Sequence, residues 1–130
     1  MGRTVLTVDD EAQTRDFIST VLEEIGYTPL LAENGDEAMD IVRQNKPDLI
    51  ILDIMMPKQS GIKMYRELKR AESLKDIPVI VCSGLPKRTY LRAQAALTES
   101  SGESVPDPDA YLEKPVTPGH LEATIKKIIG

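Results

Sequence analysis

The chain has 130 residues, of which 41% are hydrophobic and 28% charged, a composition typical of one soluble domain with a core of its own. The net charge of −5 argues against nucleic acid or an anionic membrane as the main partner. A single cysteine, Cys82, and a single histidine, His120, exclude an internal disulfide, a cysteine-rich zinc site and a multi-histidine metal site. With no leader peptide and no apolar run long enough to span a bilayer, the sequence favours a cytoplasmic protein.

The chain begins with a β-branched run at 4–8, which predicts a strand, and this strand ends in three consecutive acids at 9–11. Apolar residues at helical spacing then predict a helix that Gly26 closes. A second strand is expected over 27–32. A second helix is expected over 36–44, because it begins with acids that suit the positive end of a helix dipole.

The next segment, D-L-I-I-L at 48–52, is apolar in all but its first residue and shows no polar alternation, which predicts a central parallel strand covered on both faces. Asp53 follows this strand at its carboxyl end, where open α/β sheets bind their ligands. Pro57 and Gly61 then interrupt the chain before a third helix begins.

A fourth apolar strand is predicted over 77–82, and it ends at Ser83. The helix expected over 86–98 has a weak apolar face. That face consists of Ala93, Ala96 and Leu97. The segment 99–109 is rich in proline, serine, glycine and acids, and is expected to be a mobile loop. A short fifth strand follows at 110–113.

Lys114 and Pro115 come directly after the fifth strand, and Thr117 with Pro118 opens the last helix. The order β-α, repeated five times, predicts a parallel sheet with helices on both faces and right-handed crossovers. Such a fold places the carboxyl ends of all its strands at one edge, so residues that are distant in sequence meet there.

The residues predicted to meet at that edge are Asp9, Asp10, Asp53, Ser83 and Lys114. Three carboxylates in one cleft repel one another, so a site of this kind needs a cation. Oxygen ligands without histidine or cysteine suit Mg²⁺. A metal and a lysine to neutralise phosphoryl oxygens, a hydroxyl donor and a carboxylate nucleophile together indicate phosphoryl transfer through an acyl phosphate.

These residues lie in motifs that resemble those of a response-regulator receiver (CheY-like) domain of two-component signal transduction. The matching motifs are V-D-D-E at 8–11, D-L-I-I-L-D-I-M-M-P at 48–57, Gly61, P-V-I-V-C-S-G at 78–84 and Y-L-E-K-P at 111–115. The resemblance covers the whole chain, so residues 1–130 are expected to form one receiver domain. It implies a doubly wound, flavodoxin-like sheet of five parallel strands in the order 2-1-3-4-5, with five helices.

The resemblance also implies roles for individual residues. Asp53 would accept a phosphoryl group from the phosphohistidine of a sensor histidine kinase or phosphotransfer protein. Mg²⁺ would be bound by Asp53, by Asp10 directly, by Asp9 directly or through water, and by the backbone carbonyl of Met55. Lys114 would pair with the phosphate. The domain would catalyse only its own phosphorylation and dephosphorylation, and so would not be an enzyme acting on other substrates.

Two further residues would carry the response to phosphorylation. Ser83 would be the switch hydroxyl that moves to the phosphate, and Tyr111 the switch aromatic that turns inward as Ser83 moves. Pro115 would follow a cis peptide bond that aims the lysine. The phosphate would stabilise a minor conformation of the face formed by the fourth helix, the fifth strand and the last helix. A downstream effector or output domain, or a second copy in a homodimer, would bind that face.

Each residue also has a structural alternative. Asp9 and Asp10 could serve as N-cap and first-turn acids of the helix that follows, and Ser83 could cap the fourth helix. Lys114 could be a surface lysine, and Tyr111 could be an edge residue that only packs.

Three rival functions share part of this pattern. An aspartyl-phosphate phosphatase of the haloacid dehalogenase type needs a second acid two positions after its nucleophile, where this chain has Met55. A receiver fold that no longer takes phosphate would not need the intact acids. A flavin-binding protein of the same topology would need a phosphate-binding loop after the first strand, where acids stand instead.

The chain departs from the family pattern in two places. The segment 99–109 is longer than the short turn that is usual in receivers. Met55 and Leu85 are apolar at positions that in the family flank the attacking water, which predicts slow or moderate loss of phosphate.

Overall fold

The computed structural model describes residues 2–56 and 61–130. In these residues five parallel strands form one sheet in the order β2-β1-β3-β4-β5. The strands are β1 (Thr4–Val8), β2 (Thr28–Ala32), β3 (Leu49–Leu52), β4 (Val79–Ser83) and β5 (Ala110–Glu113). The strand order confirms the prediction, and the bounds differ from it by no more than two residues at either end of a strand. The expected break at Pro57 lies outside the described residues.

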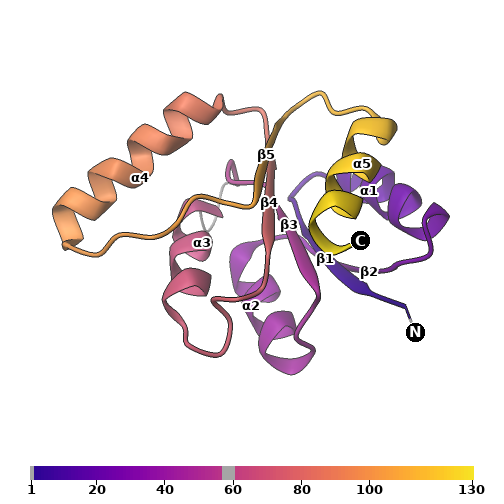
Figure 1. Ribbon diagram of the computed structural model, residues 1–130, viewed down its shortest axis with the longest axis horizontal. Helices are drawn as coiled ribbons and strands as arrows, with labels where there is room; N and C mark the ends of the chain where they lie inside the picture. The colour runs from indigo at the N-terminus through magenta and orange to yellow at the C-terminus, as the bar shows by residue number, and fades with distance from the viewer. Residues whose placement is uncertain (1, 57–60) are drawn as a thin grey trace.

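Five helices alternate with these strands. They are α1 (Ala12–Glu24), α2 (Gly35–Gln44), α3 (Gly61–Arg70), α4 (Lys87–Ser101) and α5 (Pro118–Ile129). In Figure 1, α1 and α5 cover one face of the sheet and α2 and α3 the other, while α4 projects away from the sheet. The fold is therefore doubly wound, as the alternating pattern predicted.

The sheet carries a separate core on each face because successive side chains of a strand point to opposite sides. In β3, Ile50 and Leu52 pack with α2 and α3, whereas Leu49 and Ile51 pack with α1 and α5. All four are almost completely buried, which explains why this strand has no polar alternation.

Local signals end and begin the helices as expected. Gly26 adopts a left-handed backbone with φ of 86° directly after α1, a conformation that glycine reaches without strain. The side chain of Asn34 accepts a hydrogen bond from Glu37 N at 2.9 Å at the start of α2. Thr117 does the same for His120 N at 3.2 Å at the start of α5.

The fourth helix differs from the prediction. It continues to Ser101, three residues further than expected, and ends at Gly102, whose φ is 75°. The predicted buried face was wrong, because Leu97 is 40% exposed while Tyr90 and Gln94 are buried. Tyr90 packs against other aromatic rings, and this contact buries far more area than alanine side chains offer.

The loop that follows α4 therefore covers 102–109 and is attached to the body of the domain. Asp109 exchanges two hydrogen bonds with Val79, both of 2.9 Å, at the edge of β4. The hydroxyl of Tyr65 on α3 donates to the carbonyl of Pro106 at 2.6 Å. Val105 packs against the core on this face of the sheet. The segment has defined attachments along its length.

Candidate functional site

Three carboxylates meet at the carboxyl edge of the sheet. Asp9 and Asp10 follow β1, and Asp53 follows the neighbouring strand β3. One oxygen of each lies within 4.8 Å of the others, which suits a shared metal ion. Asp9 and Asp53 are 2% and 5% exposed, whereas Asp10 is exposed. The strand order brings these acids together, as the sequence predicted.

Both the backbone N–H and the backbone carbonyl of Asp9 form hydrogen bonds that fix its position. Its N–H donates to Ala32 O at 3.1 Å, and its carbonyl accepts from Arg15 Nη1 at 2.7 Å. Its carboxylate accepts from Glu11 N at 2.9 Å. Glu11 occupies the N-cap position of α1 without a side-chain cap, so neither Asp9 nor Asp10 is the cap residue. The capping alternative does not account for these acids.

The Asp53 carboxylate is buried with few partners. Its Oδ1 accepts from Met55 N at 3.0 Å, and its Oδ2 lies 3.5 Å from Lys114 Nζ. Burial raises the pKa of Asp53, and the Met55 hydrogen bond and the Lys114 charge only partly oppose this. The repulsion from Asp9 adds to the increase. Without a further cation, the ionised form of Asp53 therefore destabilises the folded protein.

Gly61 permits the close approach of α3 to this site. A Cβ atom at position 61 would overlap the carbonyl oxygen of Asp53 and the Cα of Ile54. Both are backbone atoms that cannot rotate away. A side chain at this position would therefore displace either the helix or the strand end that presents Asp53.

Lys114 extends from the end of β5 into the acidic cluster. Its ammonium donates to Asp9 Oδ2 at 2.9 Å and lies 3.7 Å from Glu11 Oε1. Burial alone would lower the pKa of Lys114, but the hydrogen bond to Asp9 and the charges of Asp53 and Asp9 raise it. The side chain is 23% exposed, so Lys114 is not an ordinary surface lysine. The peptide bond between Lys114 and Pro115 is cis, as expected.

Ser83 is completely buried at the end of β4. Its Oγ accepts from Leu85 N at 3.1 Å, and its hydroxyl is close enough to Asp53 to lower the pKa of that carboxyl. The N-cap residue of α4 is Pro86, whose side chain has no group that could accept a capping hydrogen bond. The alternative that Ser83 caps this helix is therefore wrong.

Tyr111 on β5 points inward toward the start of α4. Its hydroxyl donates to Leu85 O at 2.5 Å, and its ring lies 5.4 Å from that of Tyr90. Burial raises the pKa of Tyr111 to about 12, so the hydroxyl remains a donor across the physiological pH range. The backbone of Leu85 thus contacts Ser83 through its N–H and Tyr111 through its carbonyl.

The residues present fit Mg²⁺ by their chemistry. One lysine does not neutralise three clustered carboxylates, and the donor set consists of oxygens without sulfur or imidazole. Hard oxygen donors with open space beside them are what Mg²⁺ prefers when it also binds a phosphoryl group.

Comparison with known proteins identifies the family. The family model described as "Response regulator receiver domain" matches residues 5–126. The chain belongs to the response regulator receiver domain family. It is a receiver domain of two-component systems.

Relatives with longer chains share this receiver domain. The chain is 39% identical over 129 residues to the phosphate regulon transcriptional regulatory protein PhoB of Pseudomonas aeruginosa, which covers 99% of this chain and 52% of PhoB. It is 35% identical over 125 residues to the probable transcriptional regulator ycf27 of Porphyra purpurea, covering 96% and 46%. The receiver domain spans about half the length of these curated relatives.

Solved structures agree on the fold. The chemotaxis response regulator CheY4 of Vibrio cholerae has a TM-score of 0.82 at 23% identity, covering 98% of this chain and 99% of that one. A signal receiver domain of a histidine kinase from Syntrophus aciditrophicus has a TM-score of 0.80 at 27% identity, covering 98% and 90%. Among the described residues of the receiver domain, no helix combines the length and apolar character needed to cross a membrane.

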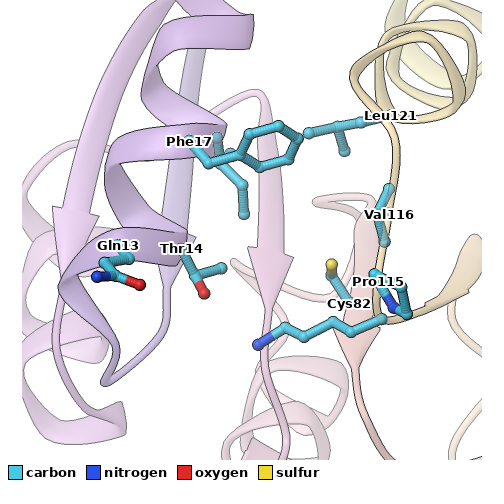
Figure 2. Close-up of a pocket in the computed structure, with 9 residues that line it drawn as sticks. Gln13, Thr14, Phe17, Cys82, Pro115, Val116 and Leu121 are labelled. Carbon is cyan, nitrogen blue, oxygen red and sulfur yellow. The ribbon is translucent and has the colours of Figure 1, made fainter.

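An apolar pocket of about 440 Å³ lies beside the acidic cluster of the receiver domain, between α1 and the β5–α5 connection. Figure 2 shows Phe17 from α1 pointing toward Leu121 from α5, with Cys82 and Pro115 lower in the view. Cys82 is buried, as expected for a small apolar residue, and burial raises its pKa to about 11.

Sequence reasoning missed three buried or half-buried polar residues of the receiver domain: Arg15, Arg66 and Gln94. Each lies on a helix with a regular pattern, where a charged or amide side chain normally faces solvent. Only their contacts with other elements reveal them, and the sequence contains no local signal for those contacts.

Proposed function

We propose that this receiver domain is a phosphoacceptor in which Asp53 takes a phosphoryl group from the phosphohistidine of a sensor histidine kinase or phosphotransfer protein. The environment of the Asp53 carboxylate carries this proposal. It is 5% exposed at the end of β3, and the nearest cation among the described residues, Lys114, lies 3.5 Å away. A buried carboxylate so weakly compensated is costly to folding, which favours a functional role.

In the proposed reaction, a carboxylate oxygen of Asp53 attacks phosphorus in line with the bond to the imidazole nitrogen. The new O–P bond forms as the N–P bond breaks, and the electron pair of that bond leaves with the imidazole. The product is an acyl phosphate. Water later attacks the same phosphorus and releases Asp53 as a carboxylate and inorganic phosphate.

The remaining residues of the cluster serve this reaction. Asp9, Asp10 and Asp53, with the backbone carbonyl of Met55, would hold Mg²⁺, which supplies positive charge to the transferring phosphoryl oxygens. Lys114, which contacts Asp9 at 2.9 Å, then pairs with the phosphoryl group. The Ser83 hydroxyl donates to a phosphoryl oxygen.

Phosphorylation of Asp53 then changes the conformation of the α4-β5-α5 face. Movement of Ser83 alters its hydrogen bond with Leu85 N, and the carbonyl of the same residue accepts from the Tyr111 hydroxyl. Tyr111 is thus the switch aromatic as well as a packed edge residue. The conformation of the face changes by population shift, because the phosphate binds one arrangement better than the other.

The partners follow from this position in a signalling chain. The input is a sensor histidine kinase or phosphotransfer protein, and the output is an effector or an output domain bound to the α4-β5-α5 face, with a homodimer through the same face. Relatives named as transcriptional regulators extend well beyond the matched region, which supports an output domain in their case. We propose that residues 1–130 are one cytoplasmic receiver domain that does not itself bind nucleic acid, since its net charge is −5.

The rival functions have less support. A phosphatase of the aspartyl-phosphate type requires an acid two positions after the nucleophile, and Met55 occupies that position with a side chain 57% exposed. A phosphate-independent binding module has no use for three carboxylates and a lysine within one cluster.

The proposal is tested by the intact mass of the protein after incubation with acetyl phosphate, with and without Mg²⁺. We expect a gain of one phosphoryl group that requires Mg²⁺ and is absent in Asp53→Ala. Asp40→Ala, which removes an exposed carboxylate on α2, is the matched control and should be phosphorylated normally. After the acetyl phosphate is removed, repeated mass measurements follow the loss of the phosphoryl group. We expect this loss to be slow or moderate because Met55 and Leu85 are apolar.

Other outcomes would redirect the assignment. Release of inorganic phosphate without a mass gain would support the phosphatase. Neither gain nor release would support the binding module. A gain that persists in Asp53→Ala would show that another residue is the acceptor.

A further inference from the structure

The contact between α3 and α4 is made through buried polar groups. Arg66 on α3 and Gln94 on α4 are each 8% exposed. Arg66 Nη1 donates to Gln94 Oε1 at 2.8 Å, and its Nη2 donates to the carbonyl of Glu103 and lies 3.4 Å from Ser101 Oγ. A buried guanidinium is tolerated only when its donors are satisfied. Arg66 therefore ties α4 and the segment after it to α3.

The same network continues to the switch tyrosine. Gln94 Nε2 donates to the hydroxyl of Tyr90 at 3.0 Å. The Tyr90 ring, which is 1% exposed, lies 5.4 Å from the ring of Tyr111 at an angle of 50°. Tyr111 in turn donates to Leu85 O. A continuous set of contacts thus runs from Arg66 to Leu85, whose N–H donates to Ser83.

The loop over 102–109 contacts this network from the side of α3. Tyr65 packs edge-on against Tyr90, with ring centroids 6.3 Å apart and an angle of 83° between the rings. Its hydroxyl donates to Pro106 O, and Arg66 binds the carbonyl of Glu103. The unusually long segment before β5 therefore supplies two carbonyl acceptors to the groups that support Tyr90.

We propose that Arg66 and Gln94 are positioning residues for the Tyr111 switch. By orienting the Tyr90 hydroxyl they fix the ring against which Tyr111 packs, and so they hold Tyr111 in the inward position that the structure shows. A buried network of this kind has few arrangements that satisfy all its donors, which makes the position of Tyr90 well defined. This inference rests on the proposed function only in treating Tyr111 as the switch residue.

Gln94 forms hydrogen bonds with both Arg66 and Tyr90. Two substitutions at this position can separate the effect of these hydrogen bonds from the effect of a changed side chain. Its carbonyl oxygen accepts from Arg66 while its amide nitrogen donates to Tyr90. In Gln94→Glu the carboxylate accepts from Arg66 and also from the Tyr90 hydroxyl, so both links persist. In Gln94→Leu, which has a similar size, both links are lost.

The experiment is ¹⁹F NMR of the full chain labelled with 3-fluorotyrosine, recorded without any phosphoryl donor. The four tyrosine signals are assigned by single substitutions to phenylalanine. In Gln94→Leu we expect the Tyr111 signal to move toward the free amino acid and to broaden more with a soluble paramagnetic agent. In Gln94→Glu the signal should stay at its wild-type position.

Arg70→Gln is the matched control on α3. It removes an exposed ion pair of 2.7 Å with the Glu103 side chain and leaves Arg66 in place. The Tyr111 signal should be unchanged. Tyr90→Phe, which keeps the ring but loses the hydroxyl, is the second variant should Gln94→Leu fail to fold, and it should shift Tyr111 in the same direction.

An unchanged Tyr111 signal in folded Gln94→Leu or Tyr90→Phe would overturn the inference. So would equal shifts in Gln94→Leu and Gln94→Glu, because steric disturbance alone would then explain them. Since no phosphoryl donor is present, failure of Asp53 to accept phosphate would leave this result intact, and the two proposals are separable.

Discussion

The Lys114 ammonium pairs with both buried acids but lies closer to Asp9: its Nζ is 2.9 Å from Asp9 Oδ2 and 3.5 Å from Asp53 Oδ2. The lysine therefore forms an ion pair with Asp9, an acid that we also expect to bind Mg²⁺. Binding of the metal to Asp9 would weaken this ion pair and free the ammonium for the phosphoryl group. Metal binding and lysine placement would then be coupled through one carboxylate.

Lys114→Met should destabilise the metal-free protein by about 1–3 kcal/mol, because Asp9 and Asp53 would remain buried without their cation. Saturating Mg²⁺ should restore part of this loss, since the ion replaces the missing charge. Urea unfolding followed by circular dichroism, with and without Mg²⁺, measures both effects. Lys126→Met, which removes an exposed lysine paired with Glu122 on α5, is the control and should change stability little. Equal losses in the two variants would contradict the prediction.

Asp53→Asn should be more stable than the wild type at neutral pH in the absence of Mg²⁺. Burial raises the pKa of Asp53 above its ordinary value of 3.8, so the folded protein binds this proton more tightly than the unfolded chain. Wild-type stability consequently falls as the pH rises from 3.8 through the raised pKa. The difference between the two proteins should thus be absent below pH 3.8 and present above the raised pKa. Urea unfolding between pH 3 and 8 checks the sign, and a difference that grows toward low pH would refute it.

Arg15→Gln should weaken Mg²⁺ binding by about 10- to 100-fold, corresponding to about 1.5–3 kcal/mol for one lost hydrogen bond from a charged donor. Arg15 donates to the backbone carbonyl of Asp9 at 2.7 Å and also contacts Glu33, so it holds the turn that presents Asp9 and Asp10. Isothermal titration calorimetry with MgCl₂ measures the affinity.

The control for loss of positive charge is Arg43→Gln, which removes an arginine whose ion pair with Glu67 is exposed. If both variants lost the same affinity, the effect would be one of overall charge and not of the turn.

Gly61→Ala should destabilise the protein by about 1–3 kcal/mol through overpacking. The added methyl would meet the Asp53 carbonyl and the Ile54 backbone, and the strand end that carries Asp53 would have to shift. Thermal unfolding measures the loss. Gly119→Ala is the matched control, because a Cβ there meets nothing within 4 Å and alanine favours the helix. A wild-type melting temperature for Gly61→Ala would show that α3 adjusts freely.

The fold and the members of the candidate site were largely predictable from the sequence. An uninterrupted apolar strand before Asp53, and the repeated β-α order, indicate a central parallel strand that ends at the ligand edge. The apolar face of α4 was not predictable. Ala93, Ala96 and Leu97 have helical spacing, but the rings of Tyr65 and Tyr111 select Tyr90 for burial, and Leu97 is left 40% exposed.

Strand propensity and apolar periodicity are local properties, so the sequence alone predicts which strands form and which acids stand at their ends. The folded chain was needed to see that Lys114 binds Asp9, that Arg15 donates to the Asp9 carbonyl and that Arg66 joins α3 to α4. These contacts join residues on different elements. Whether a charged side chain is buried depends on a partner supplied by another part of the chain, and helical or strand periodicity carries no information about that partner.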